Sequence, residues 1–169
     1  TGRSNLGVTA TANISAQLRA LATADATAKI GLFVSTDQEG GEVQVLNGPG
    51  FAEIPSGLTQ GGWPISTLGA RSATWGEQLR SAGVNHNLAP VTDTVPRATA
   101  QSNRPIGFFK REFGYTSAVT GSHAAAFGQG MKASGVHATA KQFPGLGLVS
   151  GNTDTSSCVT EERKSTRPN

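Results

Sequence analysis

The chain has 169 residues, which is enough for one domain with a sizeable core. It is 36% hydrophobic and 15% charged, and its 22 glycines suit tight turns and close approach of the backbone to a ligand. The net charge of +3 comes without a dense Lys/Arg block or an aromatic-interleaved basic patch, which disfavours nucleic-acid binding. No apolar run approaches the roughly 18 residues of a membrane-spanning helix.

Two further features bound the class of protein. Cys158 is the one cysteine, so an intrachain disulfide is excluded, and a lone cysteine in polar sequence is more often incidental than catalytic. The first residues do not resemble a signal peptide, and the chain starts at Thr1 rather than Met. We therefore expect residues upstream of Thr1 to have been removed.

The first third of the chain predicts a helix followed by a strand. Residues 12–28 favour a helix because Ile14, Leu18 and Leu21 recur at helical spacing. The apolar run 30–34 carries no charge, as in a strand buried on both faces of a sheet. It leads into an acidic, flexible segment, Asp37-Gln38-Glu39-Gly40-Gly41.

The middle of the chain repeats this pattern. Residues 67–82 predict a second helix that ends at Gly83, with one apolar stripe formed by Leu68, Trp75, Leu79 and Ala82. A second strand over 84–88 ends in a polar turn. Residues 94–114 then form a long loop rich in Pro, Arg and Asn, and loops of this length are usually functional or disordered.

A third helix and strand complete the series. Residues 115–133 are rich in Ala and Gly, which permits close packing on a sheet, and 136–140 is the third strand. The polar segment 161–169 is expected to be unstructured. The alternation of helices and strands predicts an α/β fold with a mostly parallel sheet.

Each predicted strand ends in polar, ionisable residues. Asp37 and Glu39 follow the first strand, Asp93 follows the second, and Lys141 follows the third. In a parallel α/β sheet or barrel, ligands bind at the carboxyl edge of the strands. The sequence therefore predicts a binding site at this edge.

Four segments together resemble glycoside hydrolase family 3, of the β-N-acetylglucosaminidase type. Residues 37–41 resemble its acidic Gly-Gly motif, and 87–93 its second strand end. Residues 103–114 resemble its conserved loop, through Asn103-Arg104-Pro105-Ile106-Gly107 and Arg111-Glu112-Phe113-Gly114. Residues 141–147 resemble its Lys-His-Phe-Pro-Gly motif. Their shared order and spacing over residues 3–160 argue against chance similarity.

The resemblance implies a (β/α)8 barrel, of which 169 residues can hold only part, because a complete barrel needs roughly 200 or more. We therefore expect residues 1–160 to form a partial TIM-type barrel with parallel strands and flanking helices, followed by the polar tail 161–169. Open barrel edges expose unpaired backbone and apolar faces. The chain is accordingly expected to associate with a missing barrel segment, a second copy or another chain.

The resemblance also implies three substrate-holding residues. Asp93, Arg111 and Lys141 match the positions at which family members hold the hydroxyls of the sugar in the first subsite. Carboxylate, guanidinium and ammonium groups suit this role because charge-assisted hydrogen bonds are stronger than neutral ones. A turn-capping role for Asp93 and a solvated loop position for Arg111 remain the alternatives.

Four nearby positions carry weaker implications. In the family the segment holding Asp37 and Glu39 lines or braces the pocket, so these acids are candidates to contact the substrate or to orient neighbouring Arg or Lys residues. Glu42 stands where the family often has Arg, so that role is not transferred. Gln142 replaces the family's His, which preserves hydrogen bonding to a sugar hydroxyl but not titration.

The general acid/base of this family type is commonly an Asp-x-His pair, and here those positions hold Asn152 and Asp154. Asp154 could act as the acid/base if burial or a neighbouring carboxylate raised its pKa. The alternative is that residues 152–154 are simply a turn. The histidines at positions 86, 123 and 137 lie within predicted strands or a helix and are expected to be structural.

The family's nucleophile is an Asp on a later strand, and nothing in 155–169 supplies it. The expected function of the parent protein is the hydrolysis of terminal β-linked N-acetylglucosamine from cell-wall or chitin-type glycans by a retaining two-carboxylate mechanism. The alternatives are a non-catalytic carbohydrate-binding or structural fragment and a β-glucosidase parent. Neither a cofactor nor a metal is implied, the expected partner is a carbohydrate, and the expected location is secreted or in the cell envelope.

Overall fold

The computed structural model of the chain describes residues 3–155. Within these residues the five α-helices are α1 (Gly7–Ala20), α2 (Ala24–Thr27), α3 (Gly57–Gln60), α4 (Ile65–Ser81) and α5 (Ser117–Ala133). The strands are β1 (Ser35–Thr36), β2 (Gln38–Gly40), β3 (Val43–Gln44), β4 (His86–Asn87) and β5 (His137–Ala138). Cys158, the domain boundary at 160 and the tail 161–169 lie outside the described residues.

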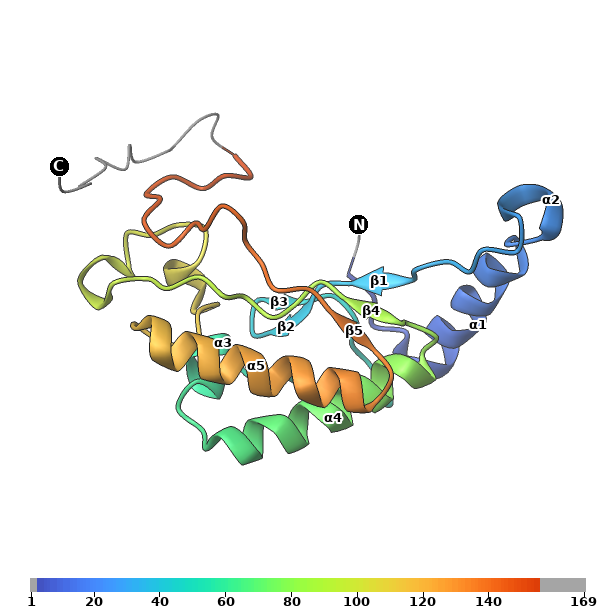
Figure 1. Cartoon of the computed structure of the whole chain (residues 1–169), viewed down its shortest axis with the longest axis horizontal. Coiled ribbons are helices and arrows are strands. Elements are labelled where there is room, and N and C mark those ends of the chain that lie inside the picture. Colours follow the sequence, from blue (N-terminus) through green and yellow to red (C-terminus); the bar gives the residue numbers. More distant parts are fainter. Residues whose placement is uncertain (1–2, 156–169) are drawn as a thin grey trace, which may run out of the picture.

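A parallel three-stranded sheet forms the centre of the fold, in the order β1-β4-β5 (Figure 1). Ser35 is in register with His86, and His86 is in register with His137. A further parallel bridge joins Val91 to Lys141 beyond the strand ends. The prediction of an α/β fold with parallel strands and flanking helices, as in part of a barrel, is confirmed.

Helices α4 and α5 lie side by side along one face of this sheet (Figure 1). The predicted stripe of α4 is buried and meets Phe127 and Met131 of α5 in the core. A Cβ on Gly130 would come within 2.5 Å of the Gly69 carbonyl oxygen, so only glycine allows this separation of the two helices. The close approach expected of this Ala- and Gly-rich helix to a sheet is thus made mainly to α4 instead.

The structure corrects the predicted helix over 12–28. Helix α1 ends at Ala20, and the short α2 begins after Thr23, whose side chain accepts a hydrogen bond from the Ala26 N–H. Ala28 then adopts a left-handed conformation that ends α2. Thr23 has an extended backbone conformation and caps α2 with its hydroxyl, so one continuous helix cannot run through it. The spacing of the apolar residues alone did not reveal this break.

The strand predicted over 30–34 is displaced. The sheet pairing starts at Ser35, and Ile30 and Phe33 are 71% and 70% exposed rather than buried on both faces. Residues 30–33 lie beyond the amino-terminal start of β4, so the part of the chain that the structure describes offers them no strand partner. The predicted strands over 84–88 and 136–140 are present but shorter, as β4 and β5.

A two-stranded hairpin, β2–β3, rises from the carboxyl end of β1. The loop predicted over 94–114 contains two short 3-10 helices, Arg97–Thr99 and Gly107–Phe109. Among residues 3–155, no helix combines the length and apolar character needed to cross a membrane.

Candidate active site

Glu39, at the centre of β2, organises the charged groups above the sheet. Its carboxylate, 5% exposed, accepts two hydrogen bonds from Arg111, with Nε to Oε2 at 2.9 Å and Nη2 to Oε1 at 2.8 Å. The remaining Nη1 of Arg111 donates to the Pro105 carbonyl at 2.7 Å. This two-point pairing fixes the plane of the guanidinium, because both N–H bonds must align with the carboxylate.

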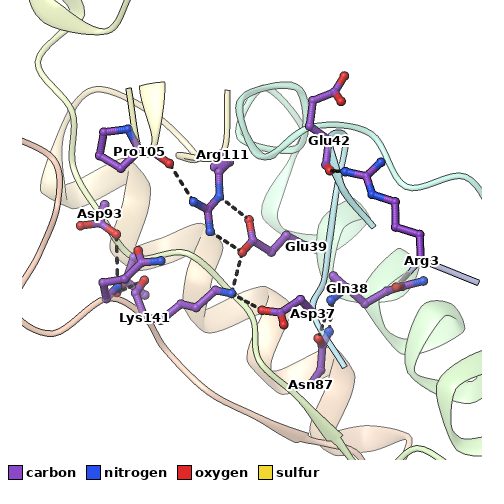
Figure 2. Close-up of polar contacts among 12 residues, drawn as sticks. Arg3, Asp37, Gln38, Glu39, Glu42, Asn87, Asp93, Pro105, Arg111 and Lys141 are labelled. Carbon is purple, nitrogen blue, oxygen red and sulfur yellow. Dashed lines mark hydrogen bonds and ion pairs between the residues drawn. The ribbon is translucent and has the colours of Figure 1, made fainter. Parts of the chain in front are cut away.

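Lys141 completes the cluster from the end of β5. Its Nζ lies 2.7 Å from Glu39 Oε1 and 2.5 Å from Asp37 Oδ1. One network is therefore formed by Asp37, Glu39, Lys141 and Arg111 (Figure 2). It has two positive and two negative charges, from segments up to 104 positions apart. Asp37 and Lys141 remain partly exposed, which leaves them accessible to a ligand.

The hairpin that carries Glu39 is fixed by buried amides. The Gln38 side chain accepts hydrogen bonds from the N–H groups of Val45 and Leu46 and donates to the Leu46 carbonyl at 2.7 Å. Gln60 Nε2 donates to the Glu39 carbonyl at 2.8 Å. Gly40 has φ 109° and lies so close to Pro55 that a Cβ would be 2.2 Å from its carbonyl oxygen. Glycine is thus required at this turn.

Asp93 holds the loop that carries Gln142. Its Oδ2 accepts a hydrogen bond from the Gln142 N–H at 3.1 Å, and its Oδ1 accepts one from the Leu146 N–H. Asp93 is 3% exposed, and a Cβ on Gly145 would lie 3.1 Å from its Oδ1. Both carboxylate oxygens are therefore engaged with the backbone of the loop, beside the charged cluster (Figure 2).

The pKa values of two site residues are shifted. Burial raises the pKa of the Asp93 carboxyl above its ordinary value, while the Leu146 and Gln142 N–H groups and the Arg111 charge act against this effect. Burial would lower the pKa of Arg111, but the hydrogen bonds and charge of Glu39 raise it, with smaller contributions from Asp93 and Asp154. Arg111 is thus fully charged within the cluster.

The two remaining predicted site residues are Gln142 and Asp154. The Oε1 atom of Gln142 is buried and has no hydrogen-bond partner among residues 3–155. Asp154 is exposed in a turn, where its N–H donates to Asn152 Oδ1 at 3.0 Å. Its charge is the smallest of the effects that act on the pKa of Arg111.

The three histidines lie outside the charged cluster. His123 is buried, with its ring nitrogens 2.9 Å and 3.0 Å from the carbonyl oxygens of Val119 and Trp63. His86 Nε2 lies 2.5 Å from the Thr139 hydroxyl, and the rings of His86 and His137 are 6.4 Å apart on neighbouring strands. These contacts agree with the structural role expected for them.

Sequence reasoning missed the supporting role of Asn103. Its amide nitrogen donates to the carbonyls of Leu146 and Val149 at 2.8 Å and 2.7 Å. Its amide oxygen accepts from the N–H groups of Ile106 and Gly107. Asn103 therefore ties the long loop to the loop after β5, although its sequence signal, an Asn before Arg-Pro, indicates only a turn.

Glu112 was also missed. It is 0% exposed, and neither carboxylate oxygen has a hydrogen-bond partner within the described residues. Burial raises the pKa of this carboxyl. No sequence signal distinguishes it from an ordinary exposed loop glutamate, because its burial is created by packing.

Comparisons with known proteins agree with this geometry. The glycosyl hydrolase family 3 N-terminal domain matches residues 2–166. A β-hexosaminidase from Stenotrophomonas maltophilia is 31% identical over 142 residues, covering 75% of this chain and 38% of the relative. A protein described as an uncharacterised secreted glycosyl hydrolase from Arthroderma benhamiae is 30% identical over 118 residues, covering 70% of this chain and 32% of the relative.

A solved structure extends the likeness to three dimensions. The β-N-acetylhexosaminidase from Beutenbergia cavernae is 54% identical to this chain, with a TM-score of 0.91. The match covers 93% of this chain and 47% of the other, so the chain spans less than half the length of these relatives. With the motifs, the parallel sheet and the domain match in agreement, the chain belongs to glycosyl hydrolase family 3, in its N-terminal domain.

Proposed function

We propose that this chain contributes the sugar-binding half of the active site of a β-N-acetylhexosaminidase, which removes terminal β-linked N-acetylglucosamine from cell-wall or chitin-type glycans. The observation that carries the proposal is the network of Asp37, Glu39, Arg111 and Lys141 at the carboxyl edge of the parallel strands. The names of the Stenotrophomonas and Beutenbergia relatives support the sugar class.

Each member of the network has a distinct role in this proposal. Lys141 and the partly exposed Asp37 hold sugar hydroxyls, as donor and acceptor respectively. Glu39 is more buried and orients both Arg111 and Lys141, so it acts through them. Asp93 positions the 141–147 loop through its backbone hydrogen bonds, and Gln142 offers the sugar a neutral amide.

The hydrolysis itself requires two carboxyl groups. In the retaining scheme one carboxylate attacks the sugar and the other protonates the leaving group, then activates water. Asp154 is the candidate acid/base because it occupies the position of the family's catalytic pair; its carboxylate is exposed in a turn of the described residues, so its burial would have to come from segments outside them. The nucleophile is assigned to a segment outside these 169 residues. No cofactor enters this scheme.

The proposal is tested by titrating the chain with N-acetylglucosamine and following backbone N–H shifts by NMR. Lys141→Met should weaken binding about tenfold or more, because a charge-assisted hydrogen bond is lost. Lys132→Met, at an exposed position of α5, is the matched control and should bind as the unaltered chain does. Equal affinity of all three proteins would overturn the assignment of this network to the sugar.

The non-catalytic alternative concerns the chain by itself. Because the nucleophile is assigned elsewhere, pure 169-residue material should not hydrolyse a chromogenic N-acetylglucosaminide. Measurable turnover would contradict this assignment and exclude the non-catalytic reading. In the longer protein, faster cleavage of a glucoside than of an N-acetylglucosaminide would favour the β-glucosidase alternative.

We also propose a secreted or envelope location, which the name of the Arthroderma relative supports. Fractionation of the source cells with an antibody against the chain tests this proposal. Recovery only with soluble cytoplasmic markers would contradict it.

A further inference from the structure

Three exposed cations lie on the long loop between β4 and α5, outside the charged cluster. Arg97, Arg104 and Lys110 are exposed, whereas Arg111 of the same loop is held by Glu39. The loop lies at the end of the molecule opposite α1 and α2 (Figure 1). We call these three exposed side chains the basic surface, and the proposed function makes no use of them.

The positive charge of the basic surface is not neutralised within its own loop. The loop contains one carboxylate, that of Glu112, and this residue is 0% exposed. Within residues 3–155, none of the three cations takes part in an ion pair. The exposed Asp154 also acts on this loop, but its effect is the smallest of those on the pKa of Arg111. The surface therefore presents three positive charges to solvent.

Two of the cations are stacked on aromatic rings. The guanidinium carbon of Arg97 lies 4.4 Å from the centre of the Tyr115 ring, and that of Arg104 lies 4.4 Å from the centre of the Phe108 ring. Phe108 in turn packs edge-to-face against Phe109, with ring centres 5.0 Å apart. Stacking limits the orientations of a guanidinium but leaves the N–H groups at its edge available, so less entropy is lost when it binds an oxyanion.

The backbone beneath the basic surface is fixed. The Asn103 amide oxygen accepts hydrogen bonds from the N–H groups of Ile106 and Gly107, between Arg104 and Lys110 in the sequence. Ile106 also belongs to a buried apolar cluster, against which the Tyr115 ring packs. The cations therefore project from a loop that is already ordered in the absence of a ligand.

We propose that the basic surface of Arg97, Arg104 and Lys110 binds a linear polymer of phosphodiester-linked units and so tethers the protein to a phosphate-bearing surface. The planar guanidinium groups match the two free oxygens of a phosphodiester, and Lys110 adds a point charge. A tether of this kind raises the local concentration of any substrate on the same surface. The inference does not depend on the proposed function, because the sugar-binding network contributes none of these three residues.

Two other polyanionic partners fit the surface less well. Single-stranded nucleic acid binds through bases that stack on open aromatic faces, whereas here a guanidinium already covers one face of each ring. Binding to an anionic membrane combines basic residues with apolar side chains that insert between the lipids. On this surface the ring of Phe108, 41% exposed, is stacked with Arg104 instead.

The test is an NMR titration of the full 169-residue chain with an oligomer of glycerol phosphate. The oligomer should shift the N–H signals of Arg97, Arg104 and Lys110. Its affinity should fall about tenfold or more between about 50 mM and about 200 mM salt, because three phosphate contacts release counterions. Three competitors are compared at equal charge, namely a single-stranded oligonucleotide, poly-glutamate and vesicles of phosphatidylglycerol.

A pair of triple variants locates the binding. Arg97→Gln, Arg104→Gln, Lys110→Gln should lower the affinity for the oligomer about tenfold or more. The control Arg71→Gln, Arg80→Gln, Lys132→Gln alters exposed cations of α4 and α5, including an arginine stacked on Trp63, and should cause a smaller loss. Each variant removes three positive charges and so lowers the formal net charge from +3 to zero. Circular dichroism verifies that both are folded.

Each outcome decides the inference. Equal losses in the two triple variants would mean that only overall charge matters, and the assignment to this surface would be overturned. Tighter binding of the oligonucleotide, of poly-glutamate or of the vesicles than of the oligomer would overturn the phosphodiester polymer as the partner. Failure of N-acetylglucosamine to bind would overturn the proposed function and leave this inference in place.

Discussion

At the scale of single residues, the site depends on how each charge is paired. Glu39 is nearly buried and serves two cations at once, so its negative charge is balanced from two directions. Lys141 is a flexible point charge, whereas the Arg111 guanidinium is planar and has a fixed set of N–H directions. The two basic residues are therefore not interchangeable in this network.

This difference predicts the effect of Arg111→Lys. The lysine keeps the charge but cannot form both bonds to Glu39 and the third bond to the Pro105 carbonyl. We expect N-acetylglucosamine affinity to fall about tenfold, measured by NMR titration. Arg104→Lys, in the same loop but outside the cluster, is the matched control. Retention of full affinity by Arg111→Lys would show that charge alone suffices.

Glu112 predicts a dependence of stability on pH. Its buried carboxyl has a raised pKa and no hydrogen-bond partner in the described chain, so ionisation destabilises the folded state. The stability that protonated Glu112 contributes to the fold is fully present below the ordinary glutamate pKa of about 4.3. It is lost as the pH rises through the pKa of Glu112 in the folded state. At neutral pH, Glu112→Gln should therefore raise the free energy of unfolding by about 1 kcal/mol or more.

Urea denaturation at pH 4 and pH 7.5 measures this effect. The gain from Glu112→Gln should be present at pH 7.5 and small at pH 4, where the carboxyl is largely protonated in both states. Glu77→Gln, on the exposed face of α4, should show no such difference. An equal gain at both pH values would contradict the explanation by ionisation.

At the scale of elements, the loops that form the site are held by side-chain amides together with a small apolar cluster of Val91, Val95, Ala100 and Ile106. Asn103 makes four hydrogen bonds that connect the 94–114 loop to the loop after β5. Gln38 and Gln60 have the corresponding role for the hairpin. Such buried amides give a loop a single conformation, because each lost bond leaves an unpaired buried group.

Asn103→Ala should lower the free energy of unfolding by about 2–4 kcal/mol, since several buried hydrogen bonds are lost together. Urea denaturation measures the total loss, and hydrogen exchange at the Ile106 and Gly107 N–H groups reports it locally. Asn13→Ala, at an exposed position of α1, is the control. Unchanged exchange at these two groups in Asn103→Ala would mean that the loops are held by other contacts.

At the scale of the whole molecule, α1 and the segment between α2 and β1 present uncovered apolar surface. Large apolar side chains are exposed over α1 and the segment after α2, namely Leu6, Ile14, Leu18, Leu21, Ile30 and Phe33. Isolated exposed apolar residues are common, but several on neighbouring segments indicate a surface that associates. This agrees with the expectation that the chain associates with a missing segment or a second copy.

We therefore predict that the isolated chain self-associates. Sedimentation velocity should give a mean mass that rises with concentration in the micromolar range. The double variant Leu18→Glu, Leu21→Glu should shift this rise to higher concentration, whereas Gln17→Glu, on the same helix, should not. A chain that stays monomeric throughout would contradict the prediction.

The fold class, the family and the alternation of three long helices with three parallel strands follow from the sequence, whereas the β2–β3 hairpin and the short helices α2 and α3 do not. Periodic apolar residues fix which segments pack, and strand ends followed by ionisable residues indicate the edge of the sheet at which a ligand binds. The stripe of α4 and the motif residues Asp37, Glu39, Asp93, Arg111 and Lys141 were identified in this way. These signals are local, so one sequence suffices to reveal them.

The tertiary structure alone decided how those residues are paired. The contacts of Lys141 with Asp37, the engagement of both Asp93 oxygens by backbone N–H groups, and the burial of Glu112 all join or enclose segments far apart in the chain. The exposure of Phe33 likewise depends on the position at which the neighbouring strand β4 begins. The spacing of apolar residues predicts which residues can be buried. Which side chains pair with one another depends on distances that exist only in the folded chain.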